Sequence, residues 1–66
     1  MGRIRRGGYI FEWWRGDHAP RHVHVSNARG QLLGRVSLAD KKPLDAWHPS
    51  PKVLEIIAEM QKEGRL

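Results

Sequence analysis

The sequence has no cysteine among its 66 residues. Disulfide bonds are therefore excluded, and so is a metal site built on thiolates. The lack of cysteine also agrees with a reducing compartment, and we expect a cytoplasmic protein. No apolar run approaches the ~18 residues of a membrane-spanning helix, and no hydrophobic segment of a signal peptide follows the N-terminal charges. We expect no association with a membrane.

The chain is also short for building a core, and we expect a single domain over residues 1–66. A chain of this length buries about 60% of the surface that its unfolded form exposes. One hydrophobic core in so small a domain rarely contributes more than ~3–5 kcal/mol. The aromatic residues (three Trp, one Tyr and one Phe) would form much of that core. A partner chain would add stability, so a homodimer is one expectation.

Acidic residues are scarce in the first half of the chain. Residues 1–36 contain seven arginines but only two acids, Glu12 and Asp17, and the whole chain has a net charge of +5. The arginine guanidinium suits phosphate, and a basic surface attracts polyanions. We expect nucleic acid to contact Arg3, Arg5, Arg6, Arg15, Arg29 and Arg35. Two alternatives stay open: a surface that only confers solubility, and a docking site for an acidic protein.

The pattern of apolar residues predicts an antiparallel sheet followed by a helix. Alternation indicates strands at about 4–6, 9–14, 22–26 and 31–38. Between the first two, Gly7-Gly8 suits a tight hairpin because glycine accepts positive φ. A helix over about 51–63 is indicated by Ser50 as N-cap, Pro51 at the first position and an apolar stripe at helical spacing. The predicted fold class is α+β, with a small antiparallel sheet of three to four strands packed by one C-terminal helix.

One glycine stands inside a predicted strand. Alternation in the 31–38 segment places four residues on one face: Leu32, Gly34, Val36 and Leu38. Because Gly34 has no side chain, it leaves a gap on that face, and we expect a crossing residue such as a tryptophan to fill it.

Three histidines fall within seven residues, beside an acid and an arginine. His22 and His24 are two apart in a predicted strand, so both side chains leave the same face. Two imidazoles can supply a proton acceptor and a proton donor, and a nearby arginine can stabilise charge that develops on phosphate. This chemistry suits metal-independent cleavage of RNA, in which the 2′-hydroxyl is the nucleophile. The candidate catalytic residues are His18, Arg21, His22 and His24.

The same segment allows other interpretations. Three histidines and an acid could hold a metal ion, and its ligands would be Asp17, His18, His22 and His24. No spacing here is specific to a metal site, so we expect no cofactor. Histidine and arginine also bind bases and phosphates without chemistry. The plainest alternative is that His22 and His24 only form the polar face of a strand.

The histidine segment belongs to a longer pattern. Three motifs occur in this order: Gly7-Gly8-Tyr9, then Asp17-His18-Ala19-Pro20-Arg21-His22-Val23-His24-Val25, and then Ser50-Pro51 with Leu54 and Ile57. Together they resemble a family of small bacterial and phage domains of unknown function, with a Gly-Gly-Tyr start and a His-x-Pro-Pro-His-x-His-Val signature. Arg21 departs from the second proline of that signature and adds a cation. The family is similar in gene context to toxin–antitoxin pairs, which implies a cognate small protein as partner.

These features lead to one main prediction with two alternatives. The main prediction is a toxin–antitoxin-like, small basic protein that binds nucleic acid or acts on it, as a metal-independent ribonuclease. The competing prediction is a non-enzymatic module that binds a cognate protein or nucleic acid. A protein that binds metal through histidines is the third.

Overall fold

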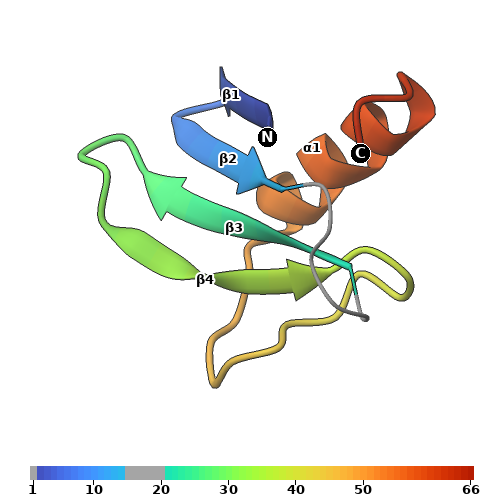
Figure 1. The fold of residues 1–66 in the computed structure, drawn as a ribbon. Coiled ribbons are helices and arrows are strands. Elements are labelled where there is room, and N and C mark those ends of the chain that lie inside the picture. The colour runs from blue at the N-terminus through green and yellow to red at the C-terminus, as the bar shows by residue number, and fades with distance from the viewer. Residues whose placement is uncertain (1, 15–20) are drawn as a thin grey trace.

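A four-stranded antiparallel sheet carries one helix on one of its faces (Figure 1). The structure is a computed structural model and describes residues 2–14 and 21–66. Its elements are β1 (Gly2–Arg6), β2 (Tyr9–Trp13), β3 (His22–Asn27), β4 (Leu32–Ser37) and α1 (Pro51–Lys62). The strands lie in the sheet in the order β1-β2-β3-β4, so each pairs with its neighbours in sequence. The predicted α+β fold class is confirmed.

Two tight turns lie at the same end of the sheet. Gly7 and Gly8 connect β1 to β2 with φ of 64° and 84°, values that glycine adopts without strain. The turn from β3 to β4 is organised by Asn27, whose Oδ1 accepts hydrogen bonds from the backbone N–H groups of Arg29 (2.9 Å) and Gln31 (3.0 Å). Positive-φ glycines therefore determine the first reversal of the chain, and the Asn27 side chain determines the second.

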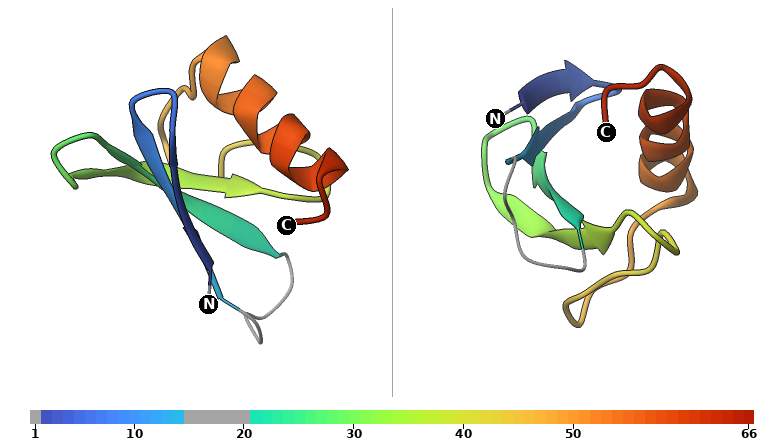
Figure 2. Two further views of the ribbon diagram at one scale, coloured as in Figure 1. Left: turned by 90° about the horizontal axis from the view of Figure 1, so that it is seen from above. Right: turned by 45° about the vertical axis from the view of Figure 1, so that its right-hand side comes forward.

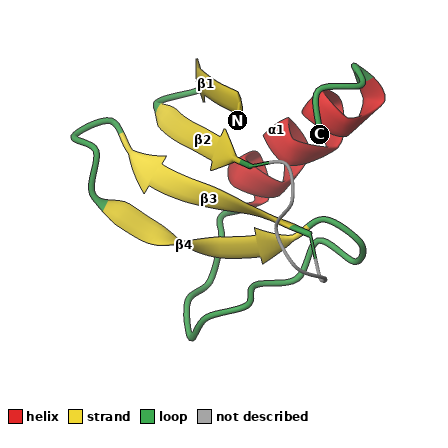
Figure 3. Cartoon of the chain, viewed as in Figure 1, coloured by secondary structure: helices red, strands yellow, loops and turns green. Residues whose placement is uncertain are grey.

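The helix begins and ends on local signals. Ser50 is the N-cap, and its Oγ accepts a hydrogen bond from the Val53 N–H at 3.3 Å. Pro51 occupies the first turn, where its missing N–H has no helical partner to lose. After the last turn, Gly64 adopts a φ of 78° and ends the helix. The helix runs diagonally across the sheet (Figure 3).

The core lies between the sheet and α1 (Figure 2). Phe11 of β2 is 0% exposed and is the largest buried side chain of the sheet. It lies among valines of the two following strands and the apolar stripe of the helix: Val23, Val25, Val36, Val53, Ile56, Ile57 and Met60. Because every second strand residue points to the helix, the intervening residues point to the opposite face of the sheet.

Trp47 fills the gap that Gly34 leaves. A Cβ placed on Gly34 would overlap the indole of Trp47, and the indole Nε1 donates a hydrogen bond to the Arg35 carbonyl at 3.0 Å. The expectation of a tryptophan over this glycine is confirmed. The segment that carries Trp47 also pairs with the outer edge of β4, through Ser37 N–H to Lys42 O (2.8 Å) and Leu44 N–H to Arg35 O (3.0 Å).

The alternation predicted for the 31–38 segment is wrong at its start. Val25 pairs with Gly34, but the next residue, Ser26, pairs with Leu32, so a bulge interrupts the register. Between these two pairs β4 contains one extra residue, Leu33. The alternation of β4 side chains between the two faces of the sheet therefore shifts by one position. Leu32, expected on the same face as Gly34, is instead 61% exposed.

Candidate functional site

The face of the sheet opposite α1, here called the outer face, carries the polar side chains of the strands. One register row crosses all four strands and runs Arg3, Glu12, His24 and Arg35. The neighbouring rows add Arg5 opposite Ile10 on β1 and β2, and His22 opposite Ser37 on β3 and β4. Figure 2 shows that α1 covers only the other face. The outer face thus carries histidines and arginines side by side.

Two of the predicted catalytic histidines lie next to each other on this face. The ring centroids of His22 and His24 are 5.0 Å apart, with an angle of 61° between the ring planes. Both side chains are half-buried in the sheet surface. A spacing of two residues in β3 produces this pairing, because alternate strand residues share a face. Two imidazoles at this separation can act on neighbouring atoms of one bound group.

Trp14 and Arg21 extend the histidine pair at the same end of the sheet. Trp14 directly follows β2 and meets the His24 ring edge-on, with centroids 4.7 Å apart and an angle of 90°. It is 36% exposed, so it does not belong to the core, where we had expected the aromatic residues. Arg21 directly precedes β3 and is exposed, and its carbonyl accepts the Leu38 N–H at 2.9 Å. An exposed indole therefore lies against the His24 imidazole, and a cationic residue directly precedes His22 in the chain.

The remaining candidates of this segment, Asp17 and His18, lie outside the described residues, as does Arg15. Within residues 2–14 and 21–66, no group of three or more His, Cys, Asp or Glu side chains could hold a metal ion. The proposed ligand set of three histidines and Asp17 is therefore untested as a whole.

Arg35 lies beside His24 and is bound by an acid that the sequence had not singled out. Asp45 accepts hydrogen bonds from Arg35 Nη2 (2.9 Å), Nε (3.2 Å) and the backbone N–H (3.1 Å). The Arg35 hydrogen bonds hold the pKa of Asp45 below its usual value, and the charge of a protonated His24 lowers it further. This carboxylate compensates the charge of Arg35, which the sequence had placed among the nucleic-acid contacts.

Replacing Asp45 with Asn should destabilise the protein at neutral pH but not in acid. The pKa of Asp45 is lower in the folded chain than in the unfolded one, so the carboxylate stabilises the fold at neutral pH. That contribution disappears as the pH falls through the folded pKa. Melting temperatures of the wild type and Asp45→Asn, measured near neutrality and again below about pH 3, test this. A difference of the same size at both pH values would contradict an effect of charge.

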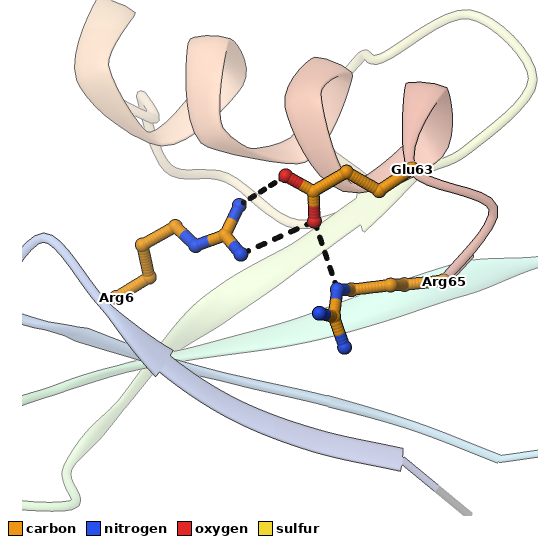
Figure 4. A network of polar contacts seen from close by, with 3 residues as sticks. All are labelled: Arg6, Glu63 and Arg65. Atoms are coloured by element: carbon orange, nitrogen blue, oxygen red, sulfur yellow. Dashed lines mark hydrogen bonds and ion pairs between the residues drawn. The ribbon is translucent and has the colours of Figure 1, made fainter.

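The other arginines divide between the two faces. Arg3 and Arg5 of β1 are exposed on the outer face, and Arg5 Nη2 donates a hydrogen bond to the Ala28 carbonyl at 3.3 Å. Arg6 lies on the helix side, where both its Nη atoms bind the Glu63 carboxylate at 3.2 Å (Figure 4). Arg65 binds the same carboxylate at 2.8 Å. Arg6 therefore joins β1 to the end of the helix, away from the histidines.

Arg29 lies in the turn between β3 and β4, at the opposite end of the sheet from Arg21. Of the predicted nucleic-acid contacts, Arg3, Arg5 and Arg35 thus lie on the face of the histidine pair, with Arg35 bound by Asp45, whereas Arg29 lies at the far end. Asp45 and Trp14 are additions to the site. No spacing in the sequence indicates the pairing of residues 35 and 45.

Comparisons of this chain with family models, with curated proteins and with solved structures found no match. Among the described residues, the helix that the chain forms is too short and too polar to cross a membrane. Any assignment of function therefore depends on the outer face and on its paired histidines.

Proposed function

We propose that this protein binds RNA on the outer face of its sheet and cleaves the strand with His22 and His24, without a metal ion. The observation that carries the proposal is the histidine pair, with ring centroids 5.0 Å apart on a face that α1 leaves uncovered. The arginines of β1 on the same face support the choice of a polyanion, as does the net charge of +5.

The reaction requires one neutral and one protonated imidazole. The neutral ring accepts the proton of the 2′-hydroxyl, whose oxygen attacks the adjacent phosphorus. The bond from phosphorus to the 5′-oxygen breaks, and the protonated ring donates its proton to that oxygen. The products are a 2′,3′-cyclic phosphate and a 5′-hydroxyl end. Arg21, exposed next to His22 in the chain, supplies positive charge for the phosphate oxygens in the transition state.

Binding would use charge and stacking together. Arg3 and Arg5 would contact phosphates of the strand, while the exposed indole of Trp14 offers a ring face to a base. Glu12 pairs with Arg3 in the register and would repel a phosphate. Phosphates would therefore bind beside Glu12 and not directly over it. A strand bound in this way would pass over the histidine pair.

A ribonuclease of this kind would be harmful in the cytoplasm, where its substrate is. A cognate small protein that covers the outer face would keep it inactive, in line with the partner that the resemblance implies. The non-enzymatic module stays the competing proposal, and it predicts RNA binding without strand cleavage.

Replacing Arg3 or Arg5 with Ser should weaken RNA binding by about threefold to fivefold each, the size of an exposed ion pair. Each loss should also lower the slope of log affinity against log salt by about 0.7, because one phosphate contact disappears. Fluorescence anisotropy with a labelled single-stranded oligoribonucleotide at several salt concentrations measures both quantities.

Lys62→Ser is the matched control for these variants. It removes the same charge from the last turn of α1, on the other side of the sheet. If Lys62→Ser weakens binding as much as Arg5→Ser, the affinity depends only on the net charge of the protein, and the outer face is not the binding surface.

A further inference from the structure

A hollow of about 440 Å³ lies at the end of the sheet that carries the two hairpin turns. Its walls are the Gly7-Gly8 turn with Tyr9, the turn from Asn27 to Arg29, and the first turn of α1 at Lys52. The volume lies in the range of small-molecule sites, about 300–1,000 Å³. The hollow lies at the opposite end of the sheet from Trp14 and the start of β3, so it is separate from the histidine pair.

Two cations from different elements line this hollow. Arg29 belongs to the turn between β3 and β4, and Lys52 belongs to the helix. No Asp or Glu is among the described residues that line it. The Oδ1 of Asn27 already accepts two backbone N–H groups, so this oxygen is not turned toward an incoming anion. The electrostatics of the hollow therefore favour a negatively charged ligand.

The glycine turn gives such a ligand access to the backbone. A Cβ placed on Gly8 would have no heavy atom within 4 Å, so the space beside this residue is open. On the other side of the turn, a Cβ on Gly7 would lie 2.6 Å from Ile56 Cδ1 and 3.0 Å from Lys52 Cε. Because Gly7 has no side chain, the turn lies close to Lys52, and because Gly8 has none, the backbone on the other side of the turn is uncovered.

We propose that this hollow binds a phosphate monoester between Arg29 and Lys52. The inference deepens the proposed function, since the terminal phosphate of a nucleic-acid strand has this chemistry, as does a free nucleotide. Arg5 connects the hollow to the outer face, because its guanidinium binds the carbonyl of Ala28 on the hollow's wall. Tyr9 lines the hollow and His24 pairs with Glu12, three residues further along β2, so about 10 Å of strand separates the hollow from the nearer histidine. A strand held by its terminal phosphate would therefore be cut at a set distance from its end.

Titration of the full ¹⁵N-labelled chain with inorganic phosphate tests the site first. Amide shifts should change at Gly7, Gly8, Arg29 and Lys52 before they change elsewhere. Lys52→Gln should weaken phosphate binding about fivefold, as expected for an exposed charge contact. The matched control, Lys62→Gln, removes the same charge from the other end of the helix and should leave the affinity unchanged. Equal losses in the two variants, or shifts spread over all basic residues, would overturn the proposal.

Three uncleavable 2′-deoxy oligonucleotides of one sequence then distinguish the source of the phosphate. They carry a phosphate at the 5′ end, at the 3′ end or at neither end. Tighter binding of one phosphorylated form, lost in Lys52→Gln, supports a strand end as the ligand. Equal binding of all three, together with Lys52-dependent binding of a mononucleotide, supports a free nucleotide. Phosphate binding in the hollow by a protein that binds no oligonucleotide would refute the proposed function and leave this site standing.

Discussion

His22→Gln and His24→Gln should each lower the rate of RNA cleavage by about 100-fold or more, with little change in RNA affinity. Glutamine keeps the polarity of each position but can neither accept nor donate a proton at neutral pH. Each half of the pair is needed, because the neutral ring and the protonated ring act in the same step. For the same reason the wild-type rate should fall on both sides of an optimum pH.

Cleavage is measured on a short oligoribonucleotide labelled at both ends, so that the cyclic phosphate product is resolved. His48→Gln is the control, since this exposed histidine lies in the loop before α1. Substrates with a single 2′-deoxy position should be resistant at that position, and a chelator should leave the rate unchanged. Unaltered cleavage in both β3 variants, or binding with no cleavage by the wild type, would refute catalysis by the pair.

Gly34→Ala should destabilise the fold by about 1–3 kcal/mol, although alanine is ordinarily no worse than glycine in a strand. The added methyl group overlaps the indole of Trp47. The indole must then move, and its hydrogen bond to the Arg35 carbonyl is lost. For a domain whose core supplies about 3–5 kcal/mol, this is a large part of the total. Urea denaturation followed by tryptophan fluorescence measures the loss.

A double-mutant cycle with Trp47→Ala separates the overlap from other effects of the methyl group. Once the indole is removed, Gly34→Ala should cost nothing or stabilise the strand, so the two changes should be strongly non-additive. Additive effects would show that the methyl group acts elsewhere, for example on the bulge next to Val25.

Local signals explain why much of the fold could be predicted from the sequence. Ser50 and Pro51 determine where α1 begins through contacts within four residues of each other, and these contacts do not depend on the rest of the chain. Alternation determined which strand residues share a face, and so His22 and His24 could be paired before the structure was known. Gly34 predicted a close approach because a glycine inside a strand leaves room for a crossing group.

Other features depend on how distant parts of the chain meet, and they could not be predicted. The bulge after Val25 shifts Leu32 to the opposite face, and Gly34 beside it did not distinguish a bulge from a close approach. Arg6 and Glu63 are 57 residues apart, so their ion pair exists only once the helix lies on the sheet. Alternation also cannot say which face the helix covers, which is why Trp14 had been assigned to the core.

The order of the strands in the sheet has a consequence for the chain as it leaves the ribosome. Each strand pairs with the one made just before it, so the sheet can form step by step during translation. The helix comes after all four strands, and until residues 51–62 emerge the apolar side chains around Phe11 have no cover. A nascent sheet with one bare apolar face invites association with other nascent chains. Slow translation just before the helix would lengthen that exposure. Rapid synthesis of residues 51–62 would shorten it and reduce aggregation of the nascent chain.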